Sequence, residues 1–264
     1  MVIQLAVAYQ VVLAVEAEKI TISDEELAWI GDKIFENECG GQTKNLIHWN
    51  EGEDFLSLGI GHFIWYAKGH KGPFDESFPK LLVFMREEGV ELPAWLAELQ
   101  RPYCPWETKE DFMRDLNSEK LSELRFFLIE TKPLQLLFLA QRLYQALPKM
   151  LEAAPEGKRE HIKEQFYRLV HSPYGFYALI DYVNFKGEGV LLTERYHGQG
   201  WGLLQVLEEM KGSEVGAPAI LEFVQAADKK LVERVNNSAG DSFEERWLPG
   251  WQKRIQTYYD IATR

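Results

Sequence analysis

A glutamate, several glycines and a histidine lie close together in the first quarter of the chain. Glu38 stands directly before Cys39 and the pair Gly40–Gly41, and after a short gap comes Ser57–His62, with the sequence Ser-Leu-Gly-Ile-Gly-His. Glycines within a predicted strand cost stability, but they let another backbone or an extended ligand approach closely. The spacing therefore predicts a cleft with a carboxylate at its edge, where a proton could be given to a bound substrate.

The position of Glu38 on its helix favours it as the acid. Ser23 or the nearby Thr21 can cap the helix at its start, and the glycine pair ends it. Glu38 continues a stripe of apolar residues at spacings of three and four, formed by Leu27, Ile30 and Ile34. A carboxyl group partly removed from water holds its proton more readily, as a general acid must. Glu36 is turned by about 200° around the helix from Ile34 and is expected to face solvent. The alternative is that Glu38 itself turns out to water.

The run Ser57–His62 resembles the Thr-Ile-Gly-x-Gly-His strand of phage-type lysozymes, which follows a catalytic glutamate at the end of the first helix. The match departs from the family at Ser57, where threonine is usual. The resemblance implies an α+β, mainly α, lysozyme-like fold, with a small β-hairpin beside the catalytic helix and a large helical body. It also implies cleavage of the β-1,4 bond of an amino-sugar polymer, with peptidoglycan as the expected substrate and Glu38 as the general acid.

Glycoside hydrolysis usually needs a second carboxylate, as nucleophile or to position a water. Residues 45–56 alternate apolar and polar side chains around an acidic turn with Glu51, Glu53 and Asp54, which predicts a hairpin. In phage-type lysozymes the second acid lies six residues before the threonine, and Glu51 matches that position. Ser57 could hold the water or the acid. If none of these acids faces the cleft, the resemblance favours lytic transglycosylases, in which one glutamate is acid and then base.

Three residues beyond the acids are candidates for contact with substrate. His62 is expected to be a scaffold residue, with contact to substrate as the alternative. Trp65 and Tyr66 lie in an aromatic, turn-rich stretch. Aromatic rings on a loop rim stack on the apolar faces of sugars, but they also close small cores. Both interpretations stay open for this pair.

A second unusual stretch surrounds residues 194–206. Its Gly202–Gln205 segment, Gly-Leu-Leu-Gln, faintly resembles the Gly-Leu-Met-Gln motif of lytic transglycosylases, although in that family the motif follows the catalytic glutamate closely. The simpler interpretation is a glycine-rich loop that opens a helix over residues 203–210. Tyr196 and Gln205 are predicted to face the cleft.

The composition of the chain limits the classes of partner and cofactor that the protein is expected to bind. The chain has 264 residues, a net charge of −12 and a pI near 5.1, and it shows no basic run. Nucleic-acid binding depends on clustered Lys and Arg, so that class is excluded. The sequence has no phosphate-binding loop, dinucleotide fingerprint, His-Glu-x-x-His, Gly-x-Ser-x-Gly or paired Cys-x-x-Cys motif. We therefore expect no cofactor and no metal.

The N-terminus predicts export. Residues 2–15 carry no charge and are mostly apolar, and Val15–Ala17 resembles a signal-peptide cleavage site. A signal peptide over residues 1–17 would leave a single domain, 18–264, in the periplasm or outside the cell. The rival interpretation is a hydrophobic strand or helix of the mature fold. No stretch is long enough to span a membrane in the mature protein.

The two cysteines leave two interpretations open. Cys39 and Cys104 could form a disulfide in an oxidising compartment, or both could be buried free thiols. A Cys–His protease is a third reading of Cys39, but a cysteine that ends a helix lacks the dipole that lowers a thiol pKa.

The rest of the chain is predicted to be helical, with a lobe joint near residues 101–107. The expected helices are 109–129, 133–151, 160–170, 175–183, 203–210, 219–235 and 243–261. Two alternatives to peptidoglycan cleavage remain: a chitosanase-like or chitinase-like hydrolase, which the acidic surface suits equally well, and a noncatalytic glycan-binding periplasmic protein.

Overall fold

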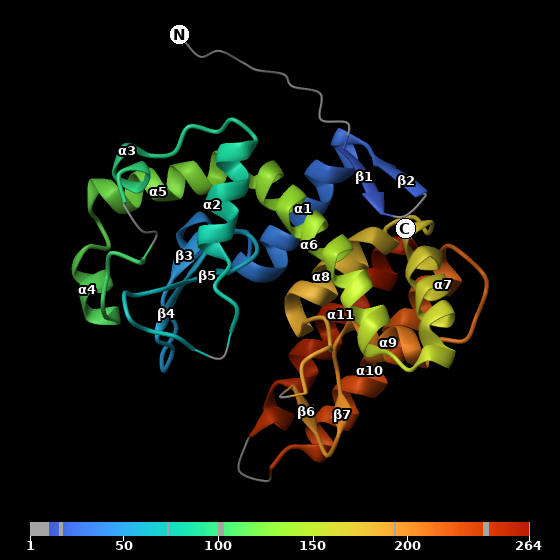
Figure 1. Ribbon diagram of the computed structural model, residues 1–264. Coiled ribbons are helices and arrows are strands. Elements are labelled where there is room, and N and C mark those ends of the chain that lie inside the picture. Colours follow the sequence, from blue (N-terminus) through green and yellow to red (C-terminus); the bar gives the residue numbers. More distant parts are fainter. Residues whose placement is uncertain are drawn as a thin grey trace. The chain divides into compact units, whose positions relative to one another are not determined.

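The protein is mainly helical, with small antiparallel sheets (Figure 1). The computed structural model describes residues 11–15, 18–72, 74–99, 103–192, 194–239 and 243–263. The chain divides into two compact units, Met1–Leu139 and Ala140–Arg264. The mainly α, α+β class is therefore confirmed. The predicted joint near residues 101–107 lies within the first unit.

The first unit contains the residues on which the predicted site depends. Its elements are β1 (Val11–Val15), β2 (Glu18–Ile22), α1 (Asp24–Cys39), η1 (Thr43–Leu46), β3 (Ile47–His48), β4 (Phe55–Leu58), β5 (Phe63–Tyr66), α2 (Phe78–Glu87), α3 (Ala94–Ala97), α4 (Lys109–Arg114), α5 (Glu119–Glu130) and the start of α6 (Lys132–Ala153).

Helix α1 has the ends and the buried stripe that its sequence predicts. The Ser23 hydroxyl accepts a hydrogen bond from the Glu26 N–H at 3.1 Å, and Gly40 ends the helix in the left-handed conformation at φ 59°. The side chains of the predicted stripe are buried: Leu27, Ile30 and Ile34. This burial fixes the rotation of α1 about its axis, and so decides which way its last turn faces.

The predicted hairpin is present as β3 and β4, extended by β5 into a three-stranded antiparallel sheet (Figure 1). In register, His48 pairs with Ser57, and Ser57 pairs with Ile64. Cross-strand partners share a face, so these three side chains lie together on one side of the sheet. The opposite face is wholly apolar and buried, with Ile47, Leu56, Leu58, Phe63 and Trp65.

The glycine run was predicted as a strand, and this prediction is wrong at its second half. Residues 59–62 form the turn between β4 and β5. Gly59 lies at φ +68°, and a Cβ there would come 2.2 Å from the Gln135 side-chain oxygen. A Cβ on Gly61 would come 2.6 Å from the Phe63 ring. The glycines are thus required by a tight turn under a helix rather than by a ligand that lies along a strand.

The predicted helix 109–129 is interrupted. Helix α4 ends at Arg114 and α5 begins after Ser118, whose hydroxyl accepts the Leu121 N–H at 3.2 Å. A serine side chain that caps a new helix competes with continuation of the old one. Helix α2 was not predicted. It lies against β5, where Phe78 packs on Trp65 with ring centroids 4.8 Å apart.

The second unit is a group of helices with one two-stranded ribbon. After the end of α6 come η2 (Glu156–Lys158), α7 (Arg159–Val170), α8 (Gly175–Lys186), β6 (Arg195–Tyr196), β7 (Gln199–Gly200), α9 (Leu203–Glu209), α10 (Ala217–Asn237), η3 (Glu244–Arg246) and α11 (Leu248–Ala262). Within this unit a buried ion pair fastens α8 to α11, because Arg254 donates two hydrogen bonds of 2.8 Å to the wholly buried Asp181.

The predicted signal peptide falls mostly outside the described residues. Within residues 1–17 only Val11–Val15 is described, and it forms β1, which pairs with β2. None of the helices in the described ranges is long and apolar enough to cross a membrane.

Candidate active site

Glu38 lies at the last turn of α1 and faces the β4–β5 turn. One carboxylate oxygen is 3.1 Å from His62 Nδ1, and its side chain is only 10% exposed. Glu36 is 57% exposed and pairs with Lys33. The stripe therefore predicts correctly which of the two glutamates turns inward.

His62 has an uncommon backbone conformation. Its φ of 46° is in the left-handed region, which few residues other than glycine adopt. The turn that carries it is anchored by Gln135 on α6, whose side-chain oxygen accepts the Ile60 N–H at 2.9 Å. The Gln135 amide donates to the Leu128 carbonyl at 2.7 Å. This wholly buried glutamine thus ties the turn that carries His62 to the helices behind it.

A second histidine lies against the first. The His48 and His62 rings are 4.6 Å apart in an edge-to-face arrangement. His48 Nδ1 is 3.1 Å from the Asn45 carbonyl, and because a carbonyl only accepts, this nitrogen carries the proton. Ser57, the cross-strand partner of His48, is buried. The structure thus brings Glu38, His62, His48 and Ser57 together at one end of the sheet.

The end of α1 is fastened to the same turn through Cys39. Its thiol contacts the Gly59 carbonyl at 3.9 Å, and its own carbonyl accepts the Asn45 side-chain amide at 3.0 Å. Burial, reinforced by the Glu38 carboxylate, raises the pKa of the Cys39 thiol to about 12. Burial also raises the pKa of Cys104 to about 12. Both cysteines are free thiols, so of the two predicted states this structure has the unbridged one. A protonated, buried Cys39 is no thiolate nucleophile.

The three acids of the β3–β4 turn do not gather around Glu38. Glu51 is 99% exposed and lies 3.4 Å from the Lys109 amine of α4. Glu53 is half-buried and accepts a hydrogen bond from the Asn50 amide at 2.9 Å. Asp54 is exposed. The Glu51 carboxylate is therefore accessible, with one long ion pair to restrain it.

The aromatic candidates of β5 belong to the core. Trp65 has no exposed surface and packs between Phe78 and Trp106. Tyr66 is buried against Phe55, with ring centroids 5.4 Å apart. Of the two predicted roles, the structure gives these rings the packing one, and neither offers a face to a ligand.

Tyr196 and Gln205 lie in the second unit and hold its ribbon together. Tyr196 donates to the Glu244 carboxylate at 3.0 Å and its ring lies 4.8 Å from that of Trp201. Gln205 is buried at the start of α9, where its side chain accepts the Gly202 N–H and donates to the Gly189 carbonyl. The predicted helix over 203–210 is confirmed as α9, and these contacts are structural.

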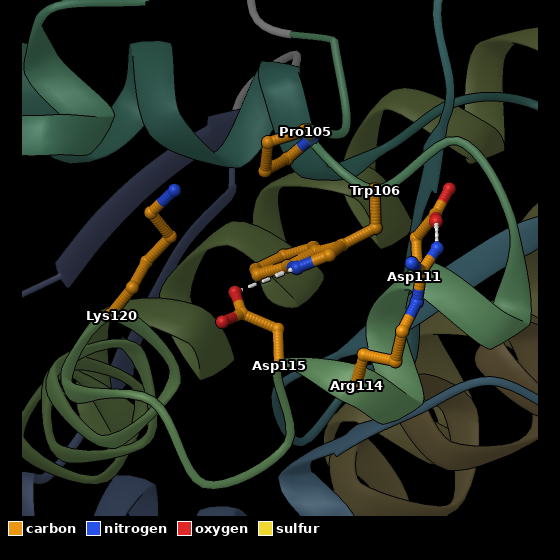
Figure 2. Close-up of a pocket in the computed structure, with 6 residues that line it drawn as sticks. All are labelled: Pro105, Trp106, Asp111, Arg114, Asp115 and Lys120. Carbon is orange, nitrogen blue, oxygen red and sulfur yellow. Dashed lines mark hydrogen bonds and ion pairs between the residues drawn. The ribbon is translucent and has the colours of Figure 1, made fainter.

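A pocket of about 400 Å³ opens elsewhere on the first unit, and no predicted site residue lines it. Figure 2 shows the Trp106 ring behind Asp115, with Lys120 on one side and the Arg114–Asp111 pair on the other. The Trp106 N–H donates to Asp115 at 2.9 Å. The only sequence signal for it is the turn around Pro105, which places an aromatic ring next to a helix start. Helix α4, which lines this pocket, also carries the Lys109 that pairs with Glu51.

Among the described side chains, no three His, Cys, Asp or Glu residues gather as a metal ion would require. No protein-family model, curated protein or solved structure matches this chain. The chemistry of the candidate site therefore rests on its own geometry.

Proposed function

We propose that the protein cleaves the β-1,4 bond of an amino-sugar polymer, with peptidoglycan as the expected substrate, a lysozyme-like arrangement of its first unit and Glu38 as general acid. The supporting observation is the position of Glu38. Glu38 lies in the last turn of a helix. Its carboxylate is largely withdrawn from water and contacts a histidine in the turn between two strands. A carboxylic acid in such a place can deliver a proton to a glycosidic oxygen as the sugar develops oxocarbenium character.

The contact with His62 adds a condition to this mechanism. Only one proton can lie between Glu38 and His62 when they are 3.1 Å apart, and it belongs either to the carboxyl group or to the imidazole. Proton donation to substrate requires that this proton lies on the carboxyl group. Glu38 is therefore the acid in the proposed reaction, and His62 positions its carboxyl group.

The second carboxylate decides between two outcomes. Glu51 is exposed and restrained by one ion pair, so a bound polymer could draw it inward to position a water, which gives hydrolysis. If Glu51 takes no part, Glu38 would serve as acid and then base, and the sugar would close on itself, as in lytic transglycosylases.

Product analysis of a polymer panel tests the proposal. Purified protein is incubated with peptidoglycan, chitosan and chitin, and the soluble products are analysed by mass spectrometry. Reducing ends from peptidoglycan indicate hydrolysis, anhydro ends indicate transglycosylation, and products from chitosan or chitin alone move the substrate to that polymer. Sedimentation with a polymer without any cleavage would leave a noncatalytic glycan-binding protein.

One observation favours a second candidate. A carboxylate on Nδ1 of a histidine is also the arrangement that orients an imidazole as general base for a serine nucleophile, and Ser57 lies on the same end of the sheet. Ser57 is buried, however, so its hydroxyl is poorly placed to meet a substrate. An acyl hydrolase is therefore the weaker proposal. Covalent labelling of Ser57 by a fluorophosphonate, abolished in Ser57→Ala, would establish it.

A peptidoglycan substrate would place the protein in the periplasm or outside the cell. This location rests on the uncharged, apolar residues 2–15. The pairing of β1 with β2 gives Val11–Val15 of this run a place in the fold, so cleavage after residue 17 would remove one strand of this hairpin.

A further inference from the structure

A lysine in the second unit lies where an ammonium ion is poorly accommodated. Lys186 ends α8, is only 8% exposed, and its amine nitrogen lies 3.3 Å from the centroid of the Trp251 ring of α11. The centroid of the Phe185 ring is 4.0 Å from the same nitrogen. Two aromatic rings therefore contact the amine.

The charged groups around Lys186 are already paired with one another. Glu244 of η3 accepts two hydrogen bonds from Arg234 of α10 and one from Tyr196 of β6. Asp181 of α8 is engaged by Arg254 and Tyr258 of α11. Both carboxylates are thus engaged by groups other than Lys186.

Both guanidinium groups approach the rings that contact the amine. Arg234 lies 5.0 Å from the Trp251 centroid, and Arg254 lies 4.3 Å from the Phe185 centroid. An ammonium at Lys186 would thus be buried beside two other cations. Cation–π contact returns less free energy than the burial of an ion without a carboxylate partner costs. The neutral amine is the favoured form.

The titration of Lys186 agrees with this geometry. Burial, with Arg234 and Arg254 adding to it and Glu244 opposing, lowers the pKa of Lys186 to about 6. At neutral pH the fraction of neutral amine is then on the order of a thousand times that of an ordinary lysine. Such an amine is a nucleophile without any activating base.

We propose that Lys186 is a carbamylation site that takes up carbon dioxide. The nitrogen lone pair attacks the carbon of CO₂, a C–N bond forms, one C=O bond opens to a carboxylate, and the nitrogen releases one proton to water. The step is redox-neutral and needs no further reactant. A linear triatomic molecule suits an amine contacted by two rings, and the anionic product lies beside Arg234 and Arg254, which would stabilise its charge.

The site is independent of the proposed glycan chemistry, because every residue it uses lies in the second unit. Carbamylation would replace a neutral amine by an anion between α8, α10 and α11. This anion would compete with Glu244 for Arg234 and with Asp181 for Arg254. Dissolved CO₂ would thereby change the contacts among these three helices.

Trapping in the intact protein tests the proposal. The full chain is equilibrated with ¹³C-bicarbonate at neutral pH, carbamates are fixed with a trialkyloxonium reagent, and digested peptides are analysed by mass spectrometry. We expect the label at Lys186 at an occupancy at least about ten times that of any other lysine. Lys230 is the matched control, because its side chain is 16% exposed but forms ion pairs with Glu209 and Glu233.

Two variants complete the experiment. Lys186→Met and Lys186→Arg should lose the ¹³C carbamate resonance of the wild-type protein, with the circular dichroism spectrum unchanged. If either variant fails to fold, the wild-type peptide map decides alone. An unlabelled Lys186, or equal labelling of Lys186 and Lys230, would overturn the proposal. Reaction of Lys186 with acetic anhydride at neutral pH without uptake of CO₂ would also overturn it.

Discussion

Gln135 ties the turn that carries His62 to the helices behind it, so its replacement tests how the candidate site is held. The change Gln135→Leu keeps the size of the side chain but removes the acceptor of the Ile60 N–H and the donor to the Leu128 carbonyl. Both partners are buried, and each buried polar group left without its partner costs about 1–3 kcal/mol. After the gain from a buried leucine, we expect the free energy of unfolding to fall by about 2–4 kcal/mol.

The assay combines stability with a local measurement. Urea unfolding followed by tryptophan fluorescence gives the loss of stability, and hydrogen exchange by mass spectrometry should show faster exchange in residues 55–66. Gln141→Leu, on the exposed side of the same helix, is the control and should stay within about 0.5 kcal/mol of the wild type. If Gln135→Leu behaved like this control and the exchange of residues 55–66 were unchanged, Gln135 would not be what holds the turn.

Four further predictions follow from the same structure. His62→Asn keeps a residue tolerant of positive φ but removes the imidazole that contacts Glu38, so the rate of glycan cleavage should fall while folding is retained; an unchanged rate would show that His62 does not position Glu38. Because the pKa of Lys186 is lowered to about 6, above that pH the unfolded chain binds a proton that the folded chain does not. Relative to Lys186→Met, wild-type unfolding free energy should therefore rise with pH between about 6 and 10, by up to about 1.4 kcal/mol per unit; a pH-independent difference in urea titrations would contradict this. Cys39 and Cys104, free and buried with pKa values of about 12, should react with a thiol reagent only after unfolding; rapid reaction in the native state would show the burial to be wrong. N-terminal sequencing of protein from cells should find a chain that begins near Glu18, and an intact Met1 in cytosolic protein would refute export.

The local spacing of apolar residues was sufficient to predict which glutamate of α1 faces inward. The spacing of Leu27, Ile30 and Ile34 fixes one face of α1, and Glu38 follows on that face four residues later, so the prediction needs no tertiary information. The pairing of β3 with β4 was also predictable, because the alternation of residues 45–56 is interrupted by a turn of acids and a glycine.

The features that the sequence left open or mispredicted have a common physical cause: contacts between residues far apart in the chain decide them. Whether Gly59 belongs to a strand or a turn is decided by Gln135, which lies far along the chain and carries no local signal. Trp65 and Tyr66 are aromatic in either role, and only their packing against Phe78 of α2, Trp106 and Phe55 makes them core residues. A lysine at a helix end, such as Lys186, is typical of a solvated side chain, and only the helices around it reveal its burial.

The central claim is that the inward carboxylate of α1 is the acid, and one comparison tests it most directly. Glu38→Gln keeps the size and hydrogen bonding of the side chain but removes its proton, whereas Glu36→Gln changes an exposed residue two positions away. With both variants folded, cleavage of purified peptidoglycan, measured by the mass of released products, should fall at least about 100-fold in Glu38→Gln and stay near the wild-type rate in Glu36→Gln. Near-normal cleavage by folded Glu38→Gln would show that Glu38 is not the acid.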